Sequence, residues 1–250
     1  MPDELLRLAR AALAFDAPLS EERAARLLRR LAVAPGGHVL DLACGRAELL
    51  LRVVLAHPGT TGTGVDADRA ALDRGRSRAA RLGLLDRVDL VEGDATAFAD
   101  RGDVVLCVGA AHAWGGAGPA LAALREHLQP GGLLLLGDGF WAAEPAPDVR
   151  ERFGDLPAGL ADAADRAAAA GYRVLEADAS TAAEWDAFEA GRRAGLVRGG
   201  PPAALEPAEE RRRAYEQGYR GSLGFAWLVL ARSAPSSGSF AATAFRAPEP

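Results

Sequence analysis

A carboxylate and a turn of small residues follow the first short apolar run of the chain. Residues 38–42 read HVLDL, so Asp41 lies next to the end of a predicted strand, and the turn ACG comes directly after it. In a parallel sheet such a turn brings backbone N–H groups and a carboxylate to the carboxyl edge, where ligands bind. An acidic group there suits a cationic or hydroxyl-bearing ligand better than a phosphate. The plainer interpretation is an ordinary strand–turn–helix connection with a solvated aspartate.

A histidine follows a later apolar run, in the segment GAAHAWGG at residues 109–116. Histidine side chains ordinarily change charge near neutral pH. At the carboxyl edge of a parallel strand, flanked by small residues, His112 is therefore a candidate general base. An orienting or simply packed histidine is the alternative.

The two cysteines, Cys44 and Cys107, lie near the ends of two of the apolar runs. Together with His112 they offer the donor types of a soft-metal site. Two small buried thiols are the simpler interpretation, and we predict no metal site.

The order of apolar runs and helical stretches along the chain predicts a parallel sheet with such an edge. Apolar runs alternate with helical stretches of 10–15 residues, which predicts an α/β fold with a parallel, doubly wound sheet. The predicted strands cover residues 38–42, 64–66 at the end of the second strand, 88–91, 103–108, 133–136, 172–177 and 225–231. We expect N-terminal helices over residues 1–34, a main domain over residues 35–232 with a helical insertion at about 158–221, and a disordered tail over residues 233–250.

Composition excludes several classes of chemistry. All 29 basic residues are arginine, and the chain contains neither lysine nor asparagine. Schiff-base, pyridoxal-phosphate and P-loop lysine chemistry are therefore excluded. The net charge is −5 with no basic block, which disfavours a nucleic-acid partner. No apolar run approaches the roughly 20 residues of a membrane span, and no secretory start is visible. We therefore expect a cytoplasmic protein without membrane association. The high content of alanine, arginine, glycine and proline is typical of a GC-rich bacterial gene.

The segment DLACGRA at residues 41–47 resembles the D/E-x-G-x-G-x-G loop of class I S-adenosylmethionine-dependent methyltransferases. Gly45 keeps the glycine that most needs backbone access. Ala43 and Ala47 stand where that family usually has glycine, and alanine is well tolerated there if φ is negative.

Further motifs match the family in order and spacing. GVDAD at residues 64–68 resembles the end of its second strand, which implies that Asp66 takes the two ribose hydroxyls. VEGDA at residues 91–95 resembles its third-strand motif, which implies that Asp94 and the backbone of Ala95 read the adenine edge. DVVLCVGA at residues 103–110 and LQPGGLLL at residues 128–135 resemble the following segments. A dinucleotide G-x-G-x-x-G motif and the Asn/Asp-Pro-Pro-aromatic motif of nucleic-acid methyltransferases are both missing.

The resemblance implies a Rossmann-like, seven-stranded sheet, mostly parallel, with residues 225–231 as the late antiparallel strand. It implies S-adenosylmethionine as the cofactor and S-adenosylhomocysteine as its product. The cofactor contacts that we expect are Asp41, Ala43, Cys44, Gly45, Asp66, Ala67, Asp94, Ala95, Cys107 and Val108.

The stretch around His112 resembles the G-A/S-x-H-A-F/W-G-G segment of a bacterial branch of small-molecule methyltransferases. This implies in-line transfer to an O, N, S or C nucleophile of a small molecule, with His112 as the catalytic residue, by a monomer or homodimer. The residues expected around the acceptor are Trp114, Asp138, Phe140, Trp141 and Trp185, with core packing as the alternative for Trp185. The alternative function is a catalytically inactive S-adenosylmethionine-binding sensor or partner subunit.

Overall fold

The computed structural model describes residues 3–233, so the tail predicted over residues 233–250 lies outside the described part of the chain except for Ser233. The strands are β1 (His38–Leu42), β2 (Thr61–Asp66), β3 (Val88–Glu92), β4 (Gly102–Val108), β5 (Leu128–Trp141), β6 (Tyr172–Ala179) and β7 (Leu223–Arg232). The helices are α1 (Asp3–Ala11), α2 (Glu21–Arg30), α3 (Glu48–Ala56), α4 (Arg69–Arg81), α5 (Ala117–Glu126), α6 (Pro147–Phe153), α7 (Leu160–Ala169), α8 (Ala182–Gly199) and α9 (Leu205–Arg213).

The strands form a single seven-stranded sheet in the order β3-β2-β1-β4-β5-β7-β6. Strand β7 runs antiparallel to both of its neighbours, and the other pairings are parallel. The central strands are almost continuously apolar because both of their faces are covered. The predicted Rossmann-like sheet with a late antiparallel strand is confirmed.

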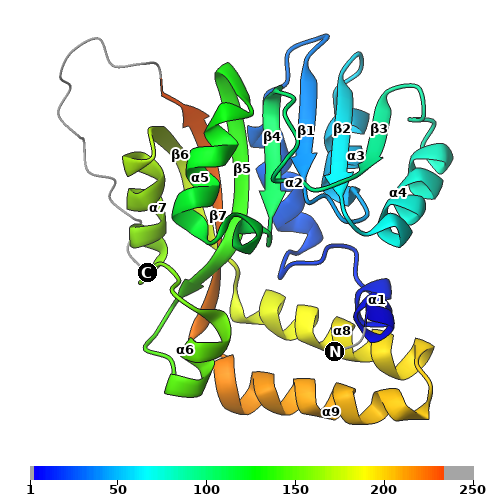
Figure 1. Ribbon diagram of the computed structural model, residues 1–250, viewed down its shortest axis with the longest axis vertical. Coiled ribbons are helices and arrows are strands. Elements are labelled where there is room, and N and C mark those ends of the chain that lie inside the picture. Colours follow the sequence, from blue (N-terminus) through cyan, green and yellow to red (C-terminus); the bar gives the residue numbers. More distant parts are fainter. Residues whose placement is uncertain (1–2, 234–250) are drawn as a thin grey trace.

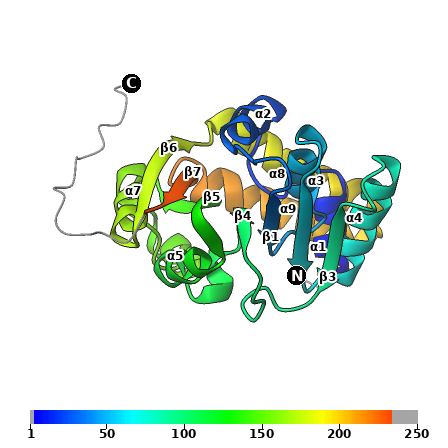
Figure 2. The same ribbon diagram turned by 90° about the horizontal axis from the view of Figure 1, so that it is seen from above.

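Helices cover both faces of the sheet. In Figure 2, α2 and α3 lie on one side and α5 and α7 on the other. Leu50 and Leu51 of α3 belong to one core cluster with Leu106 of β4, whereas Leu121 of α5 belongs to a second cluster with Cys107. Successive residues of β4 therefore face opposite layers, as the pleat of a strand requires.

A third group of helices lies beyond the end of the sheet toward which the parallel strands point (Figure 1). Helix α1 packs on α8, and α8 packs on α9. The approach of α1 is closest at Gly195, where an added Cβ would lie 2.3 Å from the carbonyl oxygen of Leu8. Within the described residues, no helix is both long and apolar enough to cross a membrane.

Strand β5 is much longer than the strand predicted at residues 133–136. The expected turn remains as a bend at Gly131, which has φ +77°, and the register against β4 slips nearby. Beyond the end of β4 the strand continues because β7 pairs with it as far as Trp141 opposite Leu223. This pairing joins segments far apart in sequence, so the local pattern does not reveal it.

Other helical boundaries also differ from the prediction. The N-terminal helices expected over residues 1–34 are α1 and α2, separated by residues 12–20, and α6 lies before the predicted helical insertion. A short 3-10 helix, η1 (Ala111–Trp114), holds the predicted histidine loop. The last part of the predicted helical insertion is α9 followed by a π-helical segment, η3 (Ala214–Tyr219).

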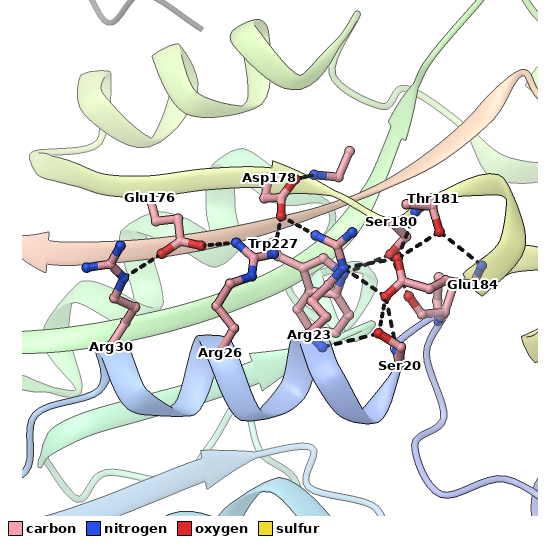
Figure 3. Close-up of polar contacts among 12 residues, drawn as sticks. Ser20, Arg23, Arg26, Arg30, Glu176, Asp178, Ser180, Thr181, Glu184 and Trp227 are labelled. Atoms are coloured by element: carbon pink, nitrogen blue, oxygen red, sulfur yellow. Dashed lines mark hydrogen bonds and ion pairs between the residues drawn. The ribbon is translucent and has the colours of Figure 1, made fainter. Parts of the chain in front are cut away.

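A network of arginines and carboxylates, which we call the α2 clamp, joins α2 to β6 and α8 (Figure 3); it comprises Ser20, Arg23, Arg26, Arg30, Glu176, Asp178 and Glu184. Arg23 donates from Nε to both carboxylate oxygens of Glu184, at 2.9 and 3.0 Å, and its guanidinium also pairs with Asp178. Arg26 pairs with Asp178 and, at 2.6 Å, with Glu176. The Arg23 and Glu184 side chains are each only 9% exposed, so this pair is the buried centre of the clamp.

The Glu184 carboxylate serves two helices at once. It forms a capping box with Thr181 at the start of α8. It also accepts from the backbone N–H of Ser20 at 3.1 Å and from its hydroxyl at 2.6 Å, and Ser20 is the N-cap of α2. Burial alone would raise the pKa of Glu184, but hydrogen bonds from Arg23, Ser20 and Thr181 outweigh it and lower the pKa to about 2. The carboxylate is therefore charged at neutral pH.

The linker between α1 and α2, residues 12–20, is held from both ends by these contacts. Ser180 donates from its hydroxyl to the carbonyl oxygen of Pro18 at 2.5 Å and accepts from the indole of Trp227 at 2.8 Å. At the other end, the side chain of Leu13 lies against Gly191 of α8, so closely that an added Cβ would be 2.5 Å from Leu13 Cδ2. The linker is thereby fixed across the end of the sheet.

Replacing Glu184 with glutamine should destabilise the fold. The Glu184→Gln variant removes the buried charge partner of Arg23 and leaves it only the more exposed Asp178, which we expect to lower the free energy of unfolding by about 2 kcal/mol. Urea unfolding followed by circular dichroism measures the change, with Glu22→Gln, on the exposed face of α2, as the matched control. A loss below about 1 kcal/mol would show that the pair behaves like a surface ion pair.

Candidate active site

The loop between β1 and α3 has an unusual backbone. Gly45 has φ +55°, and the flanking alanines Ala43 and Ala47 have φ +61° and +57°. The condition of negative φ for these alanines is therefore not met. A left-handed conformation costs a residue with a Cβ roughly 1–2 kcal/mol, and such strain is typical of ligand sites held by their surroundings.

Neighbouring elements pack tightly enough to impose this backbone. An added Cβ at Gly64 of β2 would lie 2.9 Å from Cys44 Sγ, and one at Gly75 of α4 would lie 2.9 Å from the carbonyl oxygen of Arg46. Both glycines let the loop sit directly on the sheet and on α4. The loop is thus held by contacts on two sides.

Asp66, at the end of β2, joins this loop to the next one. Its Oδ2 accepts from the backbone N–H of Gly45 at 2.7 Å, and its Oδ1 accepts from that of Asp68 at 2.8 Å. A carboxylate oxygen accepts more than one hydrogen bond, so both oxygens keep capacity for a ligand.

Asp41 is 5% exposed. Burial, reinforced by the negative charge of Asp66, raises the pKa of Asp41 to about 8. The group is therefore largely protonated at neutral pH, and a cation placed beside it would favour its ionised form.

The pKa values of both thiols lie above the ordinary value, which disfavours the thiolate form. Burial, and then the charges of Asp41 and Asp66, raises the pKa of Cys44, and burial with the charge of Asp138 raises that of Cys107. Within residues 3–233 no group of three or more histidine, cysteine, aspartate or glutamate side chains is arranged to hold a metal ion.

A cavity of about 270 Å³, the loop cavity, opens against these carboxylates. On the sheet side it is lined by seven of the predicted residues, Asp41, Ala43, Cys44, Gly45, Asp66, Val108 and His112. The linker forms its other wall through Phe15, Asp16 and Ala17, together with Arg10 of α1.

A second cavity of about 800 Å³, the large cavity, lies beside the first. Two of the predicted acceptor residues line it, Asp138 of β5 and Trp185 of α8, and His112 lines it as well. Asp16, Ala17, Gly109 and His112 border both cavities. The two spaces therefore meet at the linker and at the start of η1.

His112 is exposed at this junction. The left-handed Gly109, φ +69°, turns the chain out of β4, and Gly115, φ +84°, ends η1 after it. Burial raises the pKa of Asp138, while the Gly139 N–H and a positive charge on His112 oppose the rise. The histidine and this carboxyl thus lie near enough to interact electrostatically.

Cys107 needs correction as a cofactor contact. It is fully buried and faces the α5 layer, because residues alternate along β4 and its neighbour Val108 faces the loop cavity. The alternation of side chains along a strand predicts that Cys107 and Val108 face opposite sides of the sheet.

Three further predicted residues lie away from the loop cavity. Ala67 lines a separate hollow with Arg7 and Arg69. Asp94 is exposed, and its Oδ1 accepts from the N–H and hydroxyl of Thr96 at 2.8 and 2.7 Å. Ala95 is buried beside it.

Phe140 and Trp141, also predicted near the acceptor, do not line the large cavity. Both are 6% exposed, because β5 continues past the predicted end and holds them in the sheet. Phe140 packs over Gly224, and Trp141 meets Phe153 edge to face with ring centroids 6.3 Å apart. Trp114 is half-buried against the α5-side core and does not line the large cavity.

Several residues that line the two cavities were not predicted from the sequence. They are Arg10, Phe15, Asp16 and Ala17 near the linker, and Phe188, Glu189, Arg192, Arg211 and Tyr219 in the α8–η3 region. The helix break at residues 16–18 was a usable signal, since functional residues concentrate in loops. The charged residues of α8 and α9 have the spacing of a solvated helix face and gave no such signal.

The sheet order and the carboxylates at the ends of β1 and β2 are those expected of a class I methyltransferase. Residues 39–132 match the family model described as a methyltransferase domain. YjhP of Escherichia coli K12 is 34% identical over 186 residues, which are 70% of this chain and 73% of that protein. The chain belongs to the class I S-adenosylmethionine-dependent methyltransferase family, as the motifs predicted.

Solved structures agree over almost the whole chain. A methyltransferase of Geobacter sulfurreducens in complex with S-adenosyl-L-homocysteine has a TM-score of 0.80 at 27% identity, covering 92% of this chain and 98% of that one. The YjhP structure has a TM-score of 0.77 at 28% identity, covering 91% and 98%. A Thiobacillus denitrificans methyltransferase, also with S-adenosyl-L-homocysteine, has a TM-score of 0.77 at 27% identity, covering 92% and 98%.

The raised pKa of Asp41 predicts a pH-dependent stability. Between about pH 4 and pH 8 the folded state holds a proton that the unfolded state has lost, so Asp41 makes the fold less stable as pH rises through this window. Asp41→Asn removes this penalty. Its free energy of unfolding relative to wild type should therefore be higher at pH 9 than at pH 5, by at least ~1 kcal/mol.

Urea unfolding at the two pH values measures this difference. Asp86→Asn, at an exposed position between α4 and β3, is the control and should show no pH-dependent change. An equal effect of Asp41→Asn at both pH values would mean that Asp41 ionises like a solvent-exposed carboxyl.

Proposed function

We propose that this chain transfers the methyl group of S-adenosylmethionine to an O, N, S or C nucleophile of a small organic molecule bound in the large cavity. The observation that carries this proposal is the meeting of the two cavities at Asp16, Ala17, Gly109 and His112. A donor in the loop cavity and an acceptor in the large cavity would meet at this junction.

The residues of the loop cavity fit the cofactor. S-adenosylmethionine supplies an activated methyl group on a positively charged sulfonium. Asp41 and Asp66 put two carboxyl groups on the cavity wall, and a nearby positive charge favours ionisation of Asp41. Gly45 leaves the backbone of the loop accessible, with no atom within 4 Å of the place where a side chain would begin.

Individual contacts follow from the family motifs. Asp66 has free lone pairs on both oxygens and is assigned to the two ribose hydroxyls. Asp94 and the backbone of Ala95 are assigned to the adenine, at the open end of the same sheet edge. Both hydrogen bonds from Thr96 go to Oδ1 of Asp94, which leaves Oδ2 to accept from the adenine.

His112 is assigned to the acceptor because it borders both cavities. In its neutral form an imidazole nitrogen accepts a proton from the acceptor atom, and Asp138 nearby stabilises the positive charge that results. An in-line displacement demands little further from the protein than positioning and exclusion of water. The linker and the aromatic walls around Trp185 and Phe225 supply both.

One observation favours the alternative, an inactive cofactor-binding protein. Ala43 and Ala47 add methyl groups in left-handed positions where the family usually has glycine, and Ala43 lines the loop cavity. A narrower cavity next to the sulfonium would reduce turnover before it abolished binding.

Calorimetry with S-adenosylmethionine and a methyl-transfer assay on a panel of small-molecule acceptors test the proposal together. Wild type should bind and turn over. His112→Ala should lower turnover by about 10²-fold or more while changing cofactor affinity little, because only the proton transfer is removed. Equal losses of binding and turnover would assign His112 to packing. Binding without turnover on any acceptor would favour the inactive alternative.

Asp66→Ala should weaken binding of S-adenosylhomocysteine by roughly 1–3 kcal/mol, because charge-assisted hydrogen bonds are lost. The product is the better probe, since no chemistry follows its binding. Calorimetry gives the affinity, with Asp89→Ala, at an exposed position of β3, as the control. An unchanged affinity would place the ribose away from Asp66.

A further inference from the structure

Arginines gather at the end of the large cavity formed by α8 and α9. Arg192 of α8 and Arg211 of α9 line this wall, and Arg152 of α6 lines the cavity near it. Helices α8 and α9 lie side by side below the sheet in Figure 1 and pack against each other.

Arg192 is buried without a close partner. Its side chain is 13% exposed, and its nearest carboxylate oxygen, on Asp16, is 3.7 Å away. Asp16 is held more tightly by Arg10, at 2.5 Å. The Nε of Arg192 is buried and has no hydrogen-bond partner among the described residues. Burial, and then the charge of Arg211, lowers the pKa of Arg192, so the folded chain holds this guanidinium at a cost.

The adjacent Arg211 is already paired. It donates to Glu189 Oε1 at 2.7 Å, and the hydroxyl of Tyr219 donates to the same oxygen at 2.9 Å. Glu189 Oε2 and Arg211 Nε are also buried without hydrogen-bond partners among the described residues. Two guanidinium groups, Arg192 and Arg211, therefore lie beside one carboxylate, Glu189, on this wall, which leaves it a net positive charge. Arg152 adds further positive charge, with its guanidinium over the rings of Phe153 and Tyr219.

The remainder of the wall is aromatic. Trp185 meets Phe188, Tyr219 and Phe225 edge to face, with ring centroids 6.0–6.5 Å apart. The Arg192 guanidinium lies over the Phe188 ring at 5.3 Å. Walls of this type bind flat apolar groups, while one charged residue sets the orientation.

We infer that the acceptor is an apolar carboxylic acid, whose carboxylate pairs with Arg192 and whose apolar body lies against Trp185 and Phe188. This inference rests on the proposed function and adds the substrate class. A guanidinium matches a carboxylate with two parallel hydrogen bonds, which would satisfy the buried Nε. The nearby Glu189 carboxylate disfavours a dianionic phosphate more strongly than a monoanionic carboxylate. The carboxylate is held at the α8 wall, and the methylated atom lies at the other end, near His112.

Calorimetry on the protein saturated with S-adenosylhomocysteine tests the inference. The probes are arylalkanoic acids with one or two rings, their primary amides, and arylalkyl phosphates of the same length. The acids should bind about 10–100-fold more tightly than the amides, as expected for charge-assisted hydrogen bonds. Arg192→Gln should remove this preference, and Arg192→Lys should keep part of it.

Arg198→Gln, at an exposed position on the same helix, is the matched control and should retain the preference. Equal binding of acids and amides, tighter binding of the phosphates, or no binding of any acid at millimolar concentration would each overturn the inference. So would an acid preference that survives Arg192→Gln.

The two proposals fail in different ways. Binding of S-adenosylhomocysteine to every variant is measured first, and its retention shows that Arg192→Gln is folded with an intact loop cavity. Acids that bind but are never methylated in the presence of S-adenosylmethionine would count against the proposed function and leave the anion site standing.

Discussion

The buried ion pair between Arg23 and Glu184 is the interaction on which the arrangement of the site depends. The sheet positions its own strand ends, but the wall opposite them is made by residues 12–20, which lack regular secondary structure. These residues keep their place because one carboxylate, that of Glu184, both caps α8 and binds Ser20, the N-cap residue of α2. The Glu184 carboxylate binds the N-terminal ends of two helices and one arginine at the same time. These contacts restrict its position, and with it the position of the linker.

The linker is therefore a wall that the two cavities share. Asp16 illustrates the consequence: it faces both spaces, pairs with Arg10 on one side and lies 3.7 Å from Arg192 on the other. The strained turn at Ala43 is likewise held by contacts from other elements. Its left-handed backbone is unfavourable by itself and persists because β2, α4 and the Asp66 carboxylate hold the loop around it. The strain of this loop is thus offset by its contacts with β2 and α4.

The parts that were predictable from sequence are those where local pattern and chemistry coincide. Asp41 and Asp66 end apolar runs, and their convergence follows from the geometry of parallel strands. The position of Phe140 depends on how far β7 extends β5, which is a non-local pairing, and Asp16 depends on where α2 is clamped. Cys107 differs from these, since strand alternation alone placed it on the opposite face. The sign of φ at Ala43 was not readable, because the close packing that imposes it comes from another strand and another helix.

The position of β7 between β5 and β6 determines when the molecule becomes complete during synthesis. The neighbours β1 to β4 can pair once residue 108 has left the ribosome, so the half that carries Asp41 and Asp66 is available early. Strand β6 has no partner other than β7 in the described sheet and must wait for residues 223–232. Domains tend to form in the order of synthesis, and non-local pairings form late. The β6 side of the α2 clamp and the aromatic wall at Phe225 thus form last. A nascent chain therefore has the strand ends that carry Asp41 and Asp66 well before it can close either cavity over them.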